Sequence, residues 1–205
     1  MQELTADERL ASTQQKLDKT WGNLKIDIAR YFEGTNTDDE MQSVLRSHLY
    51  IEHEITGLLE TYLKEPEVIL GRNFFFMNKI NLATALGLIE KDERIIFLKI
   101  NNLRNKFAHN LHFNLSEDDY SNLYDSFKDD FKKMRDELSI INDASLVERT
   151  KYLLSVAWAF SKNKNDLLKL NRELESLKEE QRQVALIIYE KRRYLEELQK
   201  KVITD

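Results

Sequence analysis

The chain has 205 residues, of which 41% are hydrophobic and 33% are charged, and its net charge is −5. It contains no cysteine, one proline and five glycines, which excludes disulfides and cysteine-ligated metals and predicts few turns and long helices. The first residues are too polar for a secretory signal, and no apolar run approaches the ~18 residues of a membrane span. We therefore expect an all-α, cytoplasmic protein with no membrane-spanning segment.

The first helices are predicted from apolar side chains that recur along one face. Over residues 5–33 these side chains follow three- and four-residue steps, which is the spacing of a helix face. The run Thr37-Asp-Asp-Glu40 predicts a capping box at the start of a second helix. We expect that helix to continue to about Lys64, because Pro66 cannot extend it.

Three helices are predicted in the middle of the chain. They run from Phe74 to about Ile89, from about Asp92 to Asn110, and from Ser116 to about Leu138. The three phenylalanines at 74–76 would also suit a strand, but no other strand candidate exists to pair with it.

From Ser145 to about Val202 the absence of proline and glycine predicts one long helix. Residues 167–202 fit a heptad repeat, with apolar residues at nine of eleven core positions, which is typical of a coiled coil. The a positions are Leu167, Leu174, Gln181, Ile188, Leu195 and Val202, and the d positions are Leu170, Leu177, Val184, Lys191 and Leu198. We therefore divide the chain into a helical bundle at 1–145 and a long, coiled-coil helix at 146–205.

The apolar stripe of this helix needs a partner. A second copy of the chain would make the protein a homodimer, which is the interpretation that we favour. The first 33 residues are the internal alternative. Asn163 and Asn165, with the lysines around them, could also interrupt the helix and let it fold back.

Charge is distributed unevenly along the chain. Residues 72–110 hold seven Lys or Arg and three Asp or Glu. Residues 114–145 hold four Lys or Arg and nine Asp or Glu. The first segment could present a phosphate-binding surface despite the acidic total, although ordinary surface variation would give the same pattern.

The most informative motif is Leu103-Arg-Asn-Lys-Phe-Ala-His109, near the end of a predicted helix. Helix geometry places Arg104 and Asn105 together, and Asn105 lies one turn before His109 on the same side. Arg104 and His109 are separated by about 140° around the helix axis and ~7.5 Å along it. Leu103, Phe107 and Leu111 are expected to supply the buried apolar stripe, so the three polar side chains lie beside it rather than on it.

These side chains suit phosphoryl transfer on RNA. An imidazole, with an ordinary pKa of about 6.5, can accept the 2′-hydroxyl proton or protonate the 5′-oxygen that leaves. A guanidinium can bind the phosphate, and an amide can orient the ribose or the phosphate. No metal or cofactor is required, because the RNA supplies its own nucleophile. One histidine cannot easily be both acid and base, so two copies in a dimer could share the roles.

Arg104-Asn105, followed by three residues and His109, resembles the RxxxxH signature of the HEPN superfamily (higher eukaryotes and prokaryotes nucleotide-binding domains). A wider likeness to the mannitol operon repressor-like branch covers about residues 40–140. The segments that carry it are Glu54 to Leu63, Lys79-Ile-Asn-Leu82, Leu86-Gly-Leu-Ile89 and Leu103 to His109.

The resemblance implies a helical bundle that pairs with a second copy to form one RNA-cleaving cleft, as in toxin, abortive-infection and CRISPR-associated members. It makes His109 the acid or base, Arg104 the phosphate ligand and Asn105 the orienting residue, with Lys106 in support. Independently of the resemblance, one of the histidines and acids at positions 48–54 could orient Arg104, and Glu54 is the candidate that we favour. The implied partners are RNA, a second copy and an antitoxin or defence-system protein. Some toxin branches carry a tyrosine two residues after the histidine, where this chain has Leu111, so regulation through that tyrosine is disfavoured.

The same residues also have structural interpretations. Arg104 could pair with an acid such as Glu54, His109 could interact with the helix dipole, and Asn105 could cap the helix end. The protein would then be a non-catalytic regulatory or scaffold relative that acts through RNA or protein contacts.

No metal site is expected from the histidines of the second helix. His48 and His53 are five residues apart, whereas helical metal pairs prefer a spacing of four. His48 and Glu52 have that spacing but supply only two ligands. The chain also lacks phosphate-binding-loop, dinucleotide-binding and serine-esterase motifs, so nucleotide hydrolysis and esterase chemistry have no support.

Overall fold

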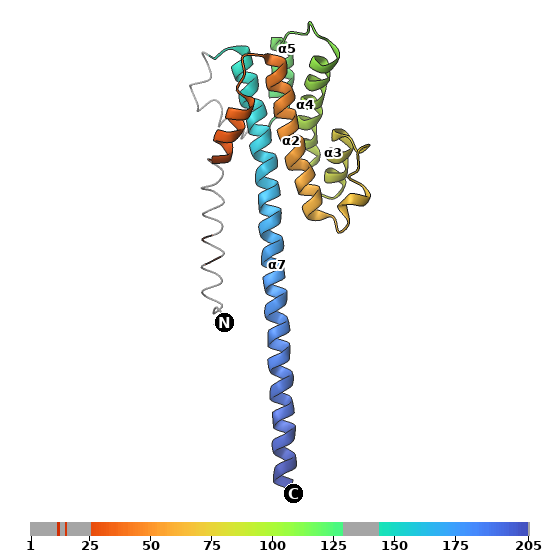
Figure 1. The fold of residues 1–205 in the computed structure, drawn as a ribbon, viewed down its shortest axis with the longest axis vertical. Helices are drawn as coiled ribbons and strands as arrows, with labels where there is room; N and C mark the ends of the chain where they lie inside the picture. The colour runs from red at the N-terminus through yellow and green to blue at the C-terminus, as the bar shows by residue number, and fades with distance from the viewer. Residues whose placement is uncertain (1–11, 13–14, 16–25, 129–143, 205) are drawn as a thin grey trace. The chain divides into compact units, whose positions relative to one another are not determined.

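The computed structural model describes residues 26–128 and 144–204, together with residues 12 and 15, and it describes side chains up to residue 193. All regular secondary structure in these ranges is helical, which confirms the predicted all-α class (Figure 1). A helix at residues 26–35 is followed by α2 (Glu40–Tyr62), the 3-10 helix η1 (Pro66–Val68), α3 (Phe76–Ala85), α4 (Lys91–His109), α5 (Glu117–Tyr124) and α7 (Leu146–Thr204).

The chain divides into two compact units, Met1–Asp166 and Leu167–Asp205. The boundary lies within α7, at residue 166 rather than at the predicted residue 145. The physical reason is that the first turns of α7 belong to the core of the bundle. Leu154 and Trp158 are buried, and the Trp158 ring stacks on Tyr31 with the ring centroids 4.5 Å apart.

The N-terminal cap of α2 is Asp39 rather than the predicted Thr37. The Asp39 side chain accepts a hydrogen bond from the backbone N–H of Gln42. The Thr37 hydroxyl instead accepts from the backbone N–H of Asp39, so it forms part of the turn before the helix. α2 ends at Tyr62, and Pro66 begins η1, in keeping with the expected stop.

α3 ends at Ala85, earlier than the predicted Ile89. Gly87 has a φ of 74°, in the left-handed region that favours glycine. The backbone N–H groups of Leu88 and Ile89 donate back to the carbonyl of Ala83, so the chain turns here. α4 then begins with a capping box formed by Glu90 and Glu93.

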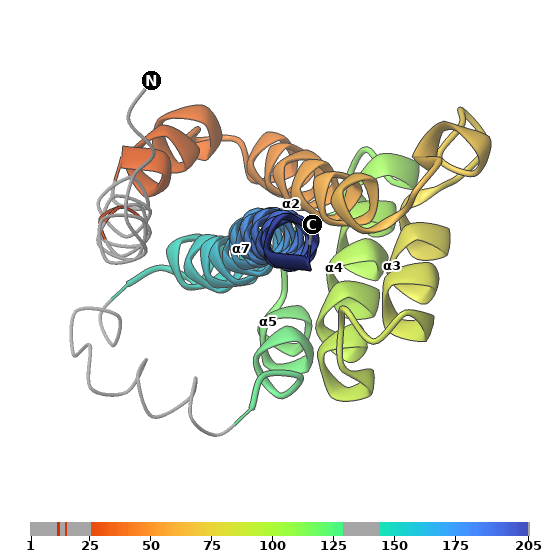
Figure 2. The ribbon, with the colours of Figure 1, turned by 90° about the horizontal axis from the view of Figure 1, so that it is seen from below.

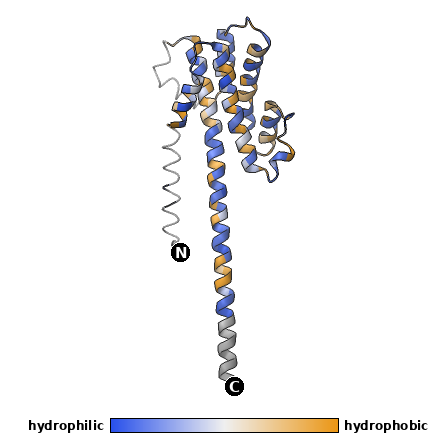
Figure 3. Ribbon diagram, viewed as in Figure 1, coloured by the Kyte–Doolittle hydropathy of each residue, from blue (hydrophilic) through white to orange (hydrophobic). Residues whose placement is uncertain are grey.

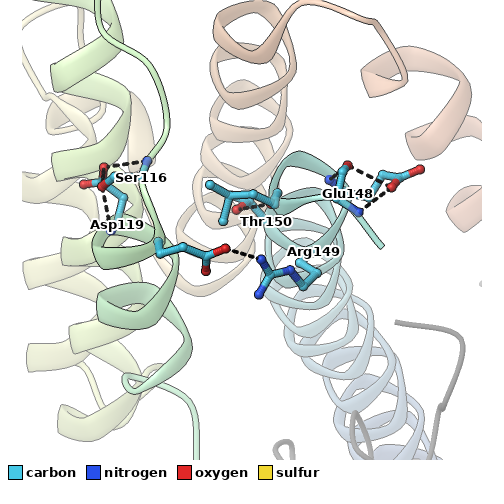
Figure 4. Close-up of polar contacts among 8 residues, drawn as sticks. Ser116, Asp119, Glu148, Arg149 and Thr150 are labelled. Carbon is cyan, nitrogen blue, oxygen red and sulfur yellow. Dashed lines mark hydrogen bonds and ion pairs between the residues drawn. The ribbon is translucent and has the colours of Figure 1, made fainter. Parts of the chain in front are cut away.

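α5 begins at the predicted place with a capping box, in which Ser116 pairs with Asp119 (Figure 4). The helix ends at Tyr124. Most of the segment that was expected to continue it to Leu138 lies outside the described residues.

The start of α7 is fixed by local hydrogen bonds and by α5 (Figure 4). Ser145 and Glu148 form a capping box, in which each side chain accepts from the other's backbone N–H. Arg149 forms an ion pair with Glu117, and its guanidinium lies 4.6 Å from the centre of the Tyr120 ring.

α7 is continuous through Asn163 and Asn165, so the alternative in which the helix folds back at these residues is wrong. In the second unit, hydrophobic residues recur among hydrophilic ones along the helix (Figure 3). The coiled coil stays a prediction. Within the described ranges, no helix has the length and apolarity that crossing a membrane requires.

In the first unit, α4 packs against α2, α3 and α5 (Figure 2). Its buried face carries Ile96, Ile100, Leu103 and Phe107. This packing leaves the residues next to Leu103 at the edge of the buried face, near α2 and α3. Leu111 was expected on the same stripe, but it lies beyond the end of the helix and is 90% exposed, so that prediction is wrong.

Gly57 allows a close approach between α2 and α7. A β-carbon at this position would lie 2.8 Å from Nδ2 of Asn165. We expect Gly57→Ala to lower the free energy of unfolding by about 1–2 kcal/mol, because overpacking outweighs the gain in helix propensity. Urea denaturation measures the change. Gly71→Ala is the matched control, since a β-carbon there meets nothing within 4 Å, and an equal loss in both variants would contradict this explanation.

Candidate functional site

Arg104 and Asn105 line an open pocket of about 640 Å³. Its walls come from α2, α3 and α4 and from the segment between η1 and α3. The polar wall residues are His48, Glu52, Lys79, Asn101, Arg104 and Asn105. The apolar wall residues are Leu70, Phe74, Phe75, Phe76 and Met77, with Gly71 and Arg72 beside them. The cavity is large enough for a small organic ligand.

Arg104 is half-buried in this wall, and its Nη1 donates a hydrogen bond to Oδ1 of Asn105 at 3.0 Å. The structure thus brings the two neighbouring motif residues together. In the part of the chain that the structure describes, no ion pair joins Arg104 to a carboxylate. The amide holds the guanidinium without neutralising it, so the positive charge is available to an anion.

His48 lies in the wall of the same pocket, and its side chain is 5% exposed. Burial lowers the pKa of His48 to about 4, and the positive charges of Arg104 and Lys79 act in the same direction, against Glu52 and Asn101. The imidazole is therefore neutral at physiological pH. Its Nε2 is buried and makes no hydrogen bond within 3.5 Å among the described residues, although the Asn101 side chain acts on the ring as a hydrogen-bond partner that raises its pKa.

Contacts on two sides fix the position of the His48 ring. Its Nδ1 lies 3.9 Å from Oε2 of Glu52, and its centroid lies 4.3 Å from that of Phe76. Glu52 in turn accepts a hydrogen bond from Nζ of Lys79 at 2.8 Å. This ion pair joins α2 to α3 and offsets one positive charge of the pocket.

His109 is the last residue of α4 and is exposed. It lies one turn after Asn105, as predicted, but it is not a wall residue of the pocket. No hydrogen bond or ion pair links His109 to Arg104 or Asn105 within the described residues. One copy of the chain therefore places the guanidinium and the amide together and leaves the imidazole apart from them.

Glu54 and Lys106, the residues expected to support the site, have other partners. Oε2 of the buried Glu54 accepts a hydrogen bond from Nδ2 of Asn165 at 3.0 Å, so this carboxylate faces α7 rather than Arg104. Lys106 forms an ion pair with Asp119, and its ammonium lies 5.6 Å from the centre of the Phe113 ring.

Sequence reasoning missed Lys79 and Asn101 as neighbours of Arg104, and on the second helix it favoured Glu54 over His48. The helical spacing of His48 and Glu52 is a recognisable signal, but on sequence alone it points only to metal binding. Within the ranges that the structure describes, no group of three or more His, Asp or Glu side chains could hold a metal ion. The pocket depends on how α3 packs across α2 and α4, which local spacing does not reveal.

No protein-family model, curated protein or solved structure matches this chain. The indications of its function lie in its residues and their geometry. They define a helical protein with a pocket that combines an unneutralised arginine, amides, a neutral buried histidine and aromatic rings.

Proposed function

We propose that the protein is a metal-independent, HEPN-type endoribonuclease that acts as a homodimer. The observation that carries the proposal is the environment of Arg104, which is held by Asn105, faces an open pocket and has no carboxylate partner among the described residues. A half-buried cation without a counter-ion favours binding of an anion such as a phosphate. His109, exposed at the end of the same helix, supplies the imidazole that the proposed RNA cleavage requires.

In the proposed reaction the 2′-oxygen of a ribose bonds to the adjacent phosphorus, and the bond from phosphorus to the 5′-oxygen breaks. One His109 imidazole accepts the 2′-hydroxyl proton, and a second, protonated His109 donates a proton to the departing 5′-oxygen. Arg104 binds the non-bridging oxygens and stabilises the extra negative charge of the transition state. Asn105 orients Arg104 and the ribose. The products are a 2′,3′-cyclic phosphate and a 5′-hydroxyl.

Two imidazoles require two copies of the chain, because each copy supplies one His109. The apolar residues of α7 support self-association. Leu167, Val184 and Ile188, at predicted heptad core positions, are 42–48% exposed. Exposed apolar residues at this spacing are typical of helices that pair with another copy.

The biological setting belongs to the same proposal. A metal-independent RNase of this type would act on RNA in the cytoplasm as a toxin or phage-defence effector. An antitoxin or another protein of the same defence system would restrain it.

His109→Ala is the decisive substitution. We expect the wild-type protein to cleave RNA in excess EDTA and to leave 2′,3′-cyclic ends, and His109→Ala to lower the rate by at least about 100-fold. Rates and end groups are measured on tRNA, rRNA and mRNA. His53→Ala is the matched control, since His53 is exposed on α2 and does not line the pocket. EDTA-sensitive cleavage, or equal cleavage by His109→Ala, would overturn the assignment.

The same variant shows whether two copies share one cleft. After subunit exchange with about a threefold excess of His109→Ala, about one wild-type copy in four is paired with another wild-type copy. If each cleft needs His109 from both copies, the activity per wild-type copy therefore falls to about a quarter. Activity that stays constant per wild-type copy, or a monomer in light scattering at micromolar concentration, would contradict the shared cleft.

A second candidate function is a non-catalytic regulatory or scaffold role of the long helix. The observation that favours it is the run Leu186, Ile187, Ile188 and Tyr189, whose side chains are 48–64% exposed. Four consecutive positions cover more of the helix surface than a two-stranded heptad seam. Absence of RNA cleavage, with His109→Ala fully functional in cells, would favour this candidate.

A further inference from the structure

The pocket beside Arg104 has features that the cleavage reaction does not use. Breaking a phosphodiester bond in this way needs a cation, an amide and imidazoles, but it needs no aromatic wall. Phe75, in that wall, is 68% exposed. An exposed ring that borders a cavity offers a face on which another flat group can stack.

His48 is a second feature without a role in the reaction. Its Nε2 lies buried in the pocket wall without a hydrogen-bond partner among the described residues. A buried polar atom in this condition is unfavourable. Because Nε2 is closed off from solvent, a ligand forms the missing hydrogen bond only when the neighbouring side chains of the wall move aside. Because burial lowers the pKa of His48 to about 4, the neutral ring can offer a donor or an acceptor at Nε2.

The charges of the pocket favour an anionic ligand. Among the described wall residues, Arg72, Lys79 and Arg104 are cations and Glu52 is the one acid. A surplus of positive charge, an aromatic face and a neutral hydrogen-bonding group suit the phosphate, the ring and the edge of a nucleotide. The volume of about 640 Å³ is in the range of pockets that hold such ligands.

We propose that this pocket is a base-recognition subsite, which takes one unpaired base of the RNA next to the phosphate that Arg104 binds. Phe75 stacks on the base and Asn101 forms a hydrogen bond to its edge, and His48 adds a second one when the wall opens around it. The inference rests on the proposed cleavage function, because Arg104 belongs to both the pocket and the cleavage site. A base that is paired in a duplex cannot enter the pocket, so the subsite selects single-stranded RNA with a preferred base beside the cut bond.

Binding can be measured apart from cleavage in protein that carries His109→Ala. In this background we expect Phe75→Ala to raise the Kd for a labelled single-stranded RNA by about tenfold, measured by fluorescence anisotropy. Phe75 is exposed, so its removal leaves the core intact. Val68→Ala is the matched control, because Val68 is 73% exposed on η1 but does not line the pocket, and it should leave the Kd unchanged.

A series of RNAs with one abasic nucleotide at each position in turn identifies the recognised base. We expect one RNA of the series to bind weakly, because it lacks the base that stacks on Phe75. The affinity for this RNA should not fall further when Phe75→Ala is introduced. In the cleavage-active protein, Phe75→Ala and His48→Asn are expected to change the preferred base beside the cut bond, as read by sequencing the cleaved ends.

The outcomes separate the two proposals. If no RNA is cut but binding depends on Phe75 and on one base, the subsite stands and the cleavage function fails. If RNA is cut and neither Phe75→Ala nor His48→Asn changes binding or base preference, the subsite is wrong and the cleavage function stands. Phe75-dependent binding of a free nucleoside monophosphate without binding of RNA would also overturn the subsite, because the pocket would then serve free nucleotides.

Discussion

Arg104→Ala is expected to lower the rate of RNA cleavage by about 10²–10³-fold. The substitution removes the charge-assisted hydrogen bonds that hold the phosphate and stabilise the transition state. Arg104→Lys restores the charge without the two-pronged geometry of the guanidinium, so we expect it to recover only part of the activity. The measurement is kcat/KM on labelled RNA in EDTA for the wild type and both variants, with thermal unfolding to show that all three are folded.

Arg94 provides the matched control on the same helix. Its Nε donates to Oδ1 of Asn81 at 2.8 Å, which is the same kind of arginine–asparagine bond that Arg104 makes with Asn105. Arg94 does not line the pocket, so Arg94→Ala should keep wild-type activity. Full activity in Arg104→Ala, or an equal loss in Arg94→Ala, would show that Arg104 has a structural role and would contradict the proposed site.

The buried faces of the helices could be predicted because apolar spacing follows the helical period. On α4, Ile96, Ile100, Leu103 and Phe107 are buried as the spacing indicates. Ile95, in the same apolar run, is 44% exposed. Spacing gives the direction of a buried face, but the width of that face depends on where the neighbouring helices lie.

Helix ends were harder to predict, because neighbouring residues compete to cap them. Thr37 and Asp39 each accept a backbone hydrogen bond before α2, and the helix begins after the second of them. Caps of these two residue types differ by only a fraction of the ~1 kcal/mol that a cap contributes, so packing decides between them.

The unit boundary within α7 has no local signal. The helical pattern is continuous from residue 146, yet Trp158 packs against Tyr31 in the core of the first unit. The period of a helix is the same whether its apolar face meets its own bundle or another partner. Only the three-dimensional contacts show where α7 stops packing in the core of the first unit and where the second unit begins.

The candidate site was predictable only where it is local. Arg104 and Asn105 are adjacent in one helix, so their proximity follows from the sequence. The partner of Glu54 depends instead on the rotation of α2. Glu52 and Glu54 are two positions apart, about 200° around the helix, so Glu52 lines the pocket and Glu54 reaches Asn165. Sequence spacing alone does not say which of the two faces Arg104.

His48 is expected to make the folded protein less stable as the pH falls below neutral. Burial lowers its pKa to about 4, and Arg104 and Lys79 act in the same direction, against Glu52 and Asn101. An unfolded chain takes up this proton at about pH 6.5, so between about pH 6.5 and about pH 4 the unfolded state binds a proton that the folded state does not. Stability is therefore complete above this window and declines through it as the pH falls, by about 3 kcal/mol in total.

Urea unfolding at a series of pH values from about 4 to about 7 measures this loss. The comparison is with His48→Asn, whose amide does not titrate, so the carboxylates contribute equally to both curves and cancel in the difference. His53→Asn, which removes an exposed imidazole from the same helix, is the control for a general effect of losing a histidine. The stability of the wild type should fall relative to that of His48→Asn as the pH decreases. Parallel curves would mean that His48 does not stay neutral while it is buried. The pocket would then lack the neutral imidazole that the proposed base recognition uses.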